Sequence, residues 1–98
     1  MLVKIHKSYR DVVAICDKEL IGKSFEKGNA ILEVKENFYN GDEVDEKKAL
    51  SIMQFHIKED ATFNIVGKKS IALALKTGII SKEGIKTIQG IPYALVLM

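Results

Sequence analysis

The sequence predicts a single α+β domain over residues 1–98, built on a mixed β-sheet with helices mainly on one face. Three observations lead to this fold class. Short β-branched runs near the N-terminus are typical of an antiparallel hairpin. Residues 45–58 carry the clearest helical pattern, and residues 61–98 follow the order strand, helix, short helix, strand. That last order predicts a C-terminal βαβ crossover.

An N-terminal hairpin is predicted over residues 2–17. Val3 and Ile5 alternate with polar residues, which indicates a half-buried strand. The continuous apolar run Val12–Cys16 is typical of a central strand. The short polar stretch between the two runs then forms the turn.

The next segment is less regular. Gly22 and Gly28 weaken the apolar helical face of residues 18–29, so we expect a loop there with one helical turn at most. Alternation over residues 32–38 predicts a third strand. The sequence Asn40-Gly41-Asp42 then ends it.

Residues 45–58 predict a helix with Asp45 at its N-cap and Glu46 in its first turn. The apolar residues at helical spacing are Ala49, Leu50, Met53 and Ile57. This stripe predicts one face packed on the sheet.

The last part of the chain predicts a strand over 62–66, a mostly buried helix around Ile71–Leu75 that stops at Gly78, and a final strand over 91–97. A helical connection between the two strands predicts that they lie parallel. The residues expected to form one core are Val13, Ile15, Leu50, Met53, Ile65, Ile71, Leu75 and Val96.

Composition excludes several classes of protein. Hydrophobic residues make up 47% and charged residues 29%, as in an ordinary globular domain. The lone Cys16 cannot form a disulfide within the chain, and His6 and His56 share no ligand spacing, so we expect no metal and no cofactor. The apolar runs are too short to span a membrane and no secretory leader is evident, which predicts a cytoplasmic protein.

Charge is unevenly distributed along the chain, although the net charge is only +2. Residues 1–35 carry +2, residues 36–60 carry −4 and residues 61–98 carry +4. This separation predicts one surface that attracts anions. Fourteen of the fifteen basic residues are lysines, which contact phosphate as point charges and read bases poorly.

The candidate anion site is Gly67, Lys68, Lys69 and Ser70, where a strand ends and a helix begins. Two lysines at a helix N-terminus oppose the helix dipole, and a bound anion would offset that placement. The alternative is that both lysines are simply solvated. The pattern is not a P-loop, because Thr62 replaces its first glycine and Lys69 its Ser or Thr.

Four stretches of the sequence resemble the archaeal family named domain of unknown function 424. These stretches are Ala14–Lys23, Phe38–Tyr39, Asn64–Ser70 and Ile88–Ala94. The resemblance covers almost the whole chain, although the family often has His where this chain has Tyr93. It implies an archaeal cytosolic protein and suggests a link to translation or RNA handling, with no established activity, cofactor or catalytic residue.

The resemblance adds Lys23 to the candidate site, because Asp17, Leu20, Gly22 and Lys23 would form a turn after the central strand. On this interpretation Lys23 joins Lys68 and Lys69 in one basic pocket. On the alternative interpretation Gly22 supplies a positive φ and Leu20 packs in the core.

Three functions remain open at this point. The first is a non-enzymatic module that binds RNA or a ribonucleoprotein, with Tyr9 or Tyr93 supplying any base contact. The second is a protein-interaction subunit that uses its apolar C-terminal strand, residues 91–98. The third is an enzyme acting on a phosphorylated metabolite, which is the weakest because no activated nucleophile or acid–base pair is evident.

Overall fold

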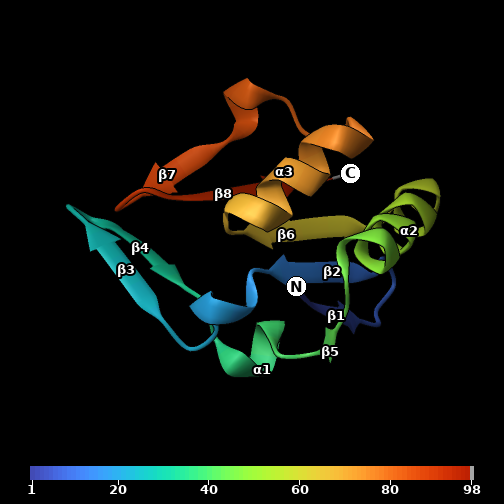
Figure 1. Cartoon of the computed structure of the whole chain (residues 1–98), viewed down its shortest axis with the longest axis horizontal. Helices are drawn as coiled ribbons and strands as arrows, with labels where there is room; N and C mark the ends of the chain where they lie inside the picture. Colours follow the sequence, from blue (N-terminus) through green and yellow to red (C-terminus); the bar gives the residue numbers. More distant parts are fainter. Residues whose placement is uncertain (98) are drawn as a thin grey trace.

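A six-stranded mixed sheet forms the centre of the computed structural model, which describes residues 1–97 (Figure 1). In spatial order its strands are β5 (Asp42–Glu43), β1 (Leu2–His6), β2 (Val12–Cys16), β6 (Thr62–Val66), β8 (Ile91–Val96) and β7 (Lys86–Ile88). The predicted α+β class with a mixed sheet is therefore confirmed.

The two longer helices, α2 (Glu46–Lys58) and α3 (Lys68–Thr77), cover one face of this sheet. The other face carries the short helix α1 (Glu36–Tyr39) and a separate two-stranded hairpin, β3 (Ser24–Lys27) with β4 (Ala30–Glu33). Two 3-10 turns, η1 (Lys18–Leu20) and η2 (Lys82–Gly84), complete the described chain. None of the helices within residues 1–97 is long and apolar enough to cross a membrane.

The N-terminal hairpin forms as predicted, with β1 and β2 antiparallel. The segment after it differs from the prediction. Residues 24–27 form β3 instead of a loop, and the strand expected over 32–38 is divided between β4 and α1. Both β3 and β4 are largely exposed. Neither strand therefore needs the alternation of apolar and polar residues by which a strand is predicted.

Helix α2 begins as predicted, because the Asp45 carboxylate accepts a hydrogen bond of 2.8 Å from the backbone amide of Lys48. Helix α3 ends at Gly78, whose φ of 79° places it in the left-handed conformation that favours glycine. Both helices contribute to the core on the same face of the sheet.

The predicted parallel pairing of residues 62–66 with 91–97 is wrong, because β6 and β8 are antiparallel. The crossover through α3 leads instead to β7, which is parallel to β6 because both are antiparallel to β8. Gln89 and Gly90 have φ of 52° and 78°, the two positive angles of a tight hairpin turn, and this turn returns the chain as β8 between them. Strand β7 has three residues, too few for a periodic signal.

Pro92 lies inside the sheet without loss of a hydrogen bond. The amide of Gly67 donates to the carbonyl of Pro92 at 2.8 Å, so position 92 faces β6. The carbonyl of Gly67 already accepts from the amide of Ile71 at 2.9 Å, as the first bond of α3. The acceptor that an N–H at position 92 would use is therefore already occupied, and proline leaves no carbonyl unpaired there.

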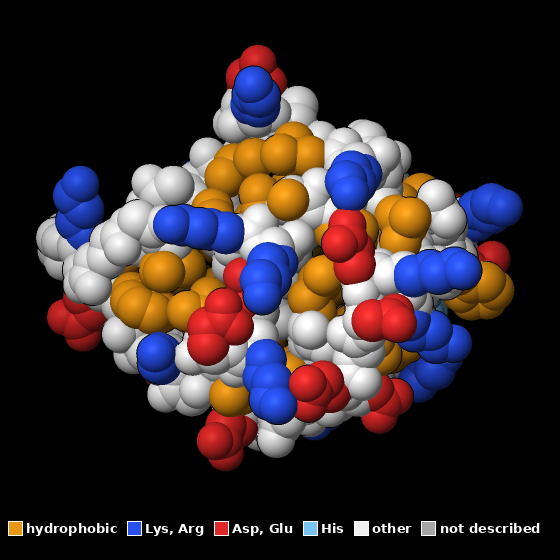
Figure 2. All heavy atoms as spheres, in the orientation of Figure 1, with side chains coloured by type: hydrophobic (Ala, Val, Ile, Leu, Met, Phe, Trp, Pro, Cys, Tyr) orange, Lys and Arg blue, Asp and Glu red, His pale blue; other side chains and the backbone are white. Residues whose placement is uncertain are grey.

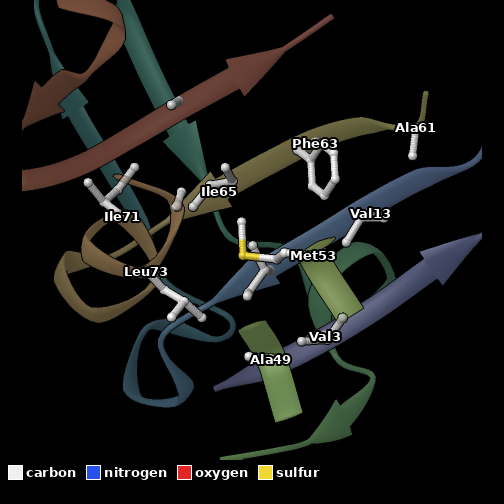
Figure 3. Close-up of a cluster of buried hydrophobic side chains, with 12 residues drawn as sticks. Val3, Val13, Ala49, Met53, Ala61, Phe63, Ile65, Ile71 and Leu73 are labelled. Atoms are coloured by element: carbon white, nitrogen blue, oxygen red, sulfur yellow. The ribbon is translucent and has the colours of Figure 1, made fainter. Parts of the chain in front are cut away.

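A hydrophobic core packs on each face of the sheet. The core under α2 and α3 contains Phe63, Met53 and Ile65, which are fully buried and lie together in Figure 3. Five of the eight predicted core residues are buried there: Val13, Ile15, Met53, Ile65 and Ile71. The other three, Leu50, Leu75 and Val96, pack against this core and are partly exposed.

Candidate anion-binding site

The candidate site lies where the parallel strands β2 and β6 end side by side. Cys16 and Val66 are opposite each other in the register, so Asp17 and Gly67 follow at the same edge of the sheet. Clefts at the carboxyl ends of parallel strands are the usual ligand sites of α/β sheets. We call Asp17, Lys18 and residues 67–70 the carboxyl edge.

The N-terminus of α3 is already occupied by a carboxylate of the protein itself. Asp17 is 3% exposed and accepts hydrogen bonds from the backbone amides of Lys69 (3.0 Å) and Ser70 (2.9 Å). The Ser70 hydroxyl donates a third bond of 2.8 Å to the same carboxylate. The anion that offsets the unfavourable lysines is therefore Asp17, which the sequence prediction did not assign to this position.

Gly67 makes this contact geometrically possible. Its φ of 110° lies in the region that L side chains rarely adopt, and a Cβ atom at Gly67 would overlap the Asp17 carboxylate. Gly67 belongs to the predicted site for a bound anion. In the structure that space receives the side chain of Asp17.

The backbone donors of the predicted site are mostly used within the molecule. The amide of Gly67 donates to Pro92, those of Lys69 and Ser70 donate to Asp17, and Ser70 is fully buried. A phosphate at the carboxyl edge would therefore contact lysine ammonium groups in place of these amides.

Lys68 and Lys69 are both exposed, but their surroundings differ. Lys69 borders a shallow groove that also contains Asp45 and Glu46. Glu46 is paired with Lys76 at 2.9 Å. Within residues 1–97 neither Lys68 nor Lys69 forms an ion pair. On the face that Figure 2 shows, lysines alternate with acidic side chains and do not form a continuous basic patch.

The contacts that fix the position of Lys23 are backbone hydrogen bonds to Leu20 and Val34. Its amide donates to the carbonyl of Leu20 (3.0 Å), and its carbonyl accepts from the amide of Val34 (2.9 Å). The lysine that the chain brings directly to the edge is Lys18, which follows Asp17 and pairs with Glu43 at 2.9 Å. Asp17 and Lys18 both belong to the stretch Ala14–Lys23 that carries the family resemblance, and this is the one signal in the sequence that points to them.

Comparison with known proteins identifies the family. Residues 6–98 match the model described as "Protein of unknown function (DUF424)". The chain belongs to the DUF424 family. It is also similar to a crystal structure of an uncharacterized conserved protein from Methanopyrus kandleri, with a TM-score of 0.85 and 22% identity over 97% of this chain and 88% of that one. This second likeness shows the fold, and a comparison with curated proteins finds no match.

Other reactive side chains of the DUF424 chain are held in structural positions. Cys16 is buried, and burial raises the pKa of its thiol to about 11, so the thiol stays protonated at neutral pH. The His6 ring stacks on Phe38 and its Nε2 lies 2.8 Å from the Phe38 carbonyl oxygen. In the described chain no three His, Cys, Asp or Glu side chains are grouped closely enough to hold a metal ion.

His56 is a buried titratable group on the last turn of α2. It is 5% exposed, and its Nδ1 has no hydrogen-bond partner. Desolvation lowers the pKa of its imidazole; Asp11 and Glu59 act in the opposite direction, and Lys7 reinforces the lowering. His56 is therefore neutral in the folded protein at neutral pH.

The buried imidazole predicts a loss of stability in mild acid. An unfolded chain binds the His56 proton near the ordinary pKa of about 6.5, while the folded chain binds it only at lower pH. The stabilisation is thus complete above pH 6.5 and is lost as pH falls through the folded pKa. We expect urea midpoints to fall between pH 7 and about pH 5.

Replacing His56→Leu should flatten this pH dependence, because the leucine side chain cannot bind a proton. Urea titrations of both proteins at several pH values measure the effect. An NMR titration of the parent should place the His56 midpoint below 6.5. An unchanged slope in the variant, or a midpoint above that value, would show that His56 is not the group responsible.

Proposed function

We propose that this DUF424 protein is a non-catalytic module that binds RNA through lysine contacts to phosphate at the carboxyl edge. The observation that carries the proposal is the exposure of Lys68 and Lys69 at the start of α3, with no ion pair within residues 1–97. The segment to which they belong, residues 61–98, carries a net charge of +4. Exposed, unpaired ammonium groups are the ordinary means of holding phosphate without reading sequence.

Asp17 determines what kind of binding to expect. Because its carboxylate uses the amides of Lys69 and Ser70, the phosphate would be held by flexible ammonium groups. Such contacts are sensitive to salt and have little sequence preference. The same arrangement removes the amide cradle that an enzyme acting on a phosphorylated metabolite would use at this position.

Tyr93 lies at the same end of the sheet as these lysines, and it packs against the core on the face away from α2 and α3. It is opposite Val66 in the register, and its neighbour Pro92 is hydrogen-bonded to Gly67. Tyr9, by contrast, is 99% exposed in the turn between β1 and β2, at the other end of the strands. Any stacking on a base would therefore involve Tyr93.

Replacing Lys68→Ala and Lys69→Ala together should weaken RNA binding and reduce its salt slope by at most about two units, since each phosphate contact releases on the order of one counterion. Lys68→Ala alone should have the larger effect of the two single changes, because Lys69 borders Asp45 and Glu46. Fluorescence anisotropy with a labelled single-stranded RNA at several salt concentrations measures both quantities.

The matched control is the double change Lys47→Ala and Lys48→Ala. These lysines are also exposed in the first turn of a helix, and their removal changes the net charge equally. RNA binding should be nearly unaffected in this control. The proposal is wrong if the parent shows no binding at low salt, if the Lys68/Lys69 variant binds like the parent, or if both double variants weaken binding alike.

A further inference from the structure

We infer that the end of β8 pairs with the same strand of a second copy of this chain, which forms a weak two-fold dimer independent of RNA binding. The edge of the sheet at β8 is only partly covered by β7. Strand β7 reaches only to Tyr93, where Lys86 is its partner. Strand β8 continues to Val96, which is opposite Phe63 of β6. The last residues of β8 therefore have a strand neighbour on one side only.

The register shows which backbone groups are open at this edge. Pro92 faces β6, because its carbonyl accepts from Gly67. In an antiparallel ladder alternate residues face the same neighbour. Leu95 thus faces away from β6, toward the side where β7 has ended. Its N–H and C=O groups have no strand partner there.

The side chains at this edge are apolar and exposed. Leu95 is 58% exposed and Leu97 is 74% exposed. Leu97 directly follows the last residue of β8 and is two residues from Leu95, so continuation of the strand by one residue on pairing would place both leucines on the same face of the sheet. No charged residue follows Lys86 in the sequence. Natural sheets usually protect a free edge with a lysine, an inward charge or a proline that interrupts pairing.

A second copy fits this edge because the segment is complementary to itself. Two identical strands pair antiparallel about a two-fold axis, which closes the assembly at a dimer. Registers that use Tyr93 are blocked, because Lys86 already occupies its open side. The first open register places Leu95 opposite Leu97 of the second copy, with the two Val96 residues facing each other at the axis.

Self-pairing in this register brings Leu95 and Leu97 of both copies together on one face. No charged side chain lies opposite another of the same sign, because none follows Lys86. The contact is short, however, and well below the roughly 1,200 Å² that a stable interface buries. The dimer should therefore be weak, and its population should rise with protein concentration. Sedimentation equilibrium of the parent should show an average mass that increases from monomer toward dimer as concentration approaches about 1 mM.

The double change Leu95→Lys and Leu97→Lys should keep the protein monomeric at every concentration. Ile31→Lys is the matched control, because Ile31 is 60% exposed on β4, away from this edge, and its variant should dimerise like the parent. Circular dichroism establishes that the variants fold. The inference is overturned if the parent stays monomeric, if the Leu95/Leu97 variant still dimerises, or if Ile31→Lys abolishes the dimer equally.

A cross-linking experiment tests the register itself. Val96→Cys should form an intermolecular disulfide under mild oxidation, because facing residues of a non-hydrogen-bonded pair lie about 4.5 Å apart at Cα. Leu97→Cys should cross-link much less, since the two copies of that residue are offset along the strands. Cys16 is buried and does not compete. Equal cross-linking of both variants, or none of Val96→Cys, would overturn the proposed register and the dimer built on it.

Discussion

Replacing Asp17→Ala is expected to lower the free energy of unfolding by about 3–4 kcal/mol. The carboxylate accepts three hydrogen bonds, from the amides of Lys69 and Ser70 and from the Ser70 hydroxyl. Alanine would leave these donors without a partner in a buried position, and it would remove the only acidic group that the described structure places on the N-terminus of α3. Both losses act on the folded state.

The comparison with Asp45→Ala separates the buried contact of Asp17, with its three hydrogen bonds, from ordinary helix capping. Asp45 caps α2 through one hydrogen bond to Lys48, and it is exposed. Its loss should cost about 1 kcal/mol, as for an ordinary helix cap. Urea unfolding followed by circular dichroism measures both variants. A cost for Asp17→Ala no greater than that for Asp45→Ala would show that the buried contact contributes little beyond capping.

The sequence could identify the position of this site but not its occupant. Gly67, Lys68 and Lys69 stand out because basic residues at a helix N-terminus require a compensating anion. That anion comes from Asp17, which is separated from Lys69 by 52 residues. Asp17 can be assigned to this position only if β2 and β6 are known to be parallel neighbours. No local sequence pattern predicts which strands pair.

The same limit applies to the fold. Residues 46–58 form the predicted helix because an amphipathic stripe and an N-cap act locally. The pairing of β6 with β8 was not predictable in this way, because it depends on β7, a strand of three residues. The Gln89-Gly90 turn between β7 and β8 is the one local feature of this hairpin, and its positive φ angles are known only from the structure.

Periodicity also could not rank the residues within α3. The run Ile71–Leu75 is apolar almost all round, so Leu75 was as good a core candidate as Leu73. In the structure Leu73 is 2% exposed, while Leu75 is only partly buried. The position of α2 decides the difference, since it covers one side of α3 while the sheet covers another.

Leu73→Ala should therefore destabilise the protein by about 2–5 kcal/mol, the range observed when a leucine is removed from a close-packed core. Leu73 packs in the cluster that contains Met53 and Ile65 (Figure 3). Close-packed side chains relax only partly into a cavity, so most of the lost contact is not recovered. Leu75→Ala is the matched change on the same helix. It should cost about 1 kcal/mol, because part of the leucine side chain is already in contact with water.

Thermal and urea unfolding of the two variants measure the difference directly. Both substitutions replace leucine by alanine in one helix, so helix propensity contributes equally to each. A difference between them reports burial alone. Equal losses of stability would mean that α3 is rotated about its axis relative to the packing described, and the assignment of Leu73 to the core between α2 and the sheet would then be wrong.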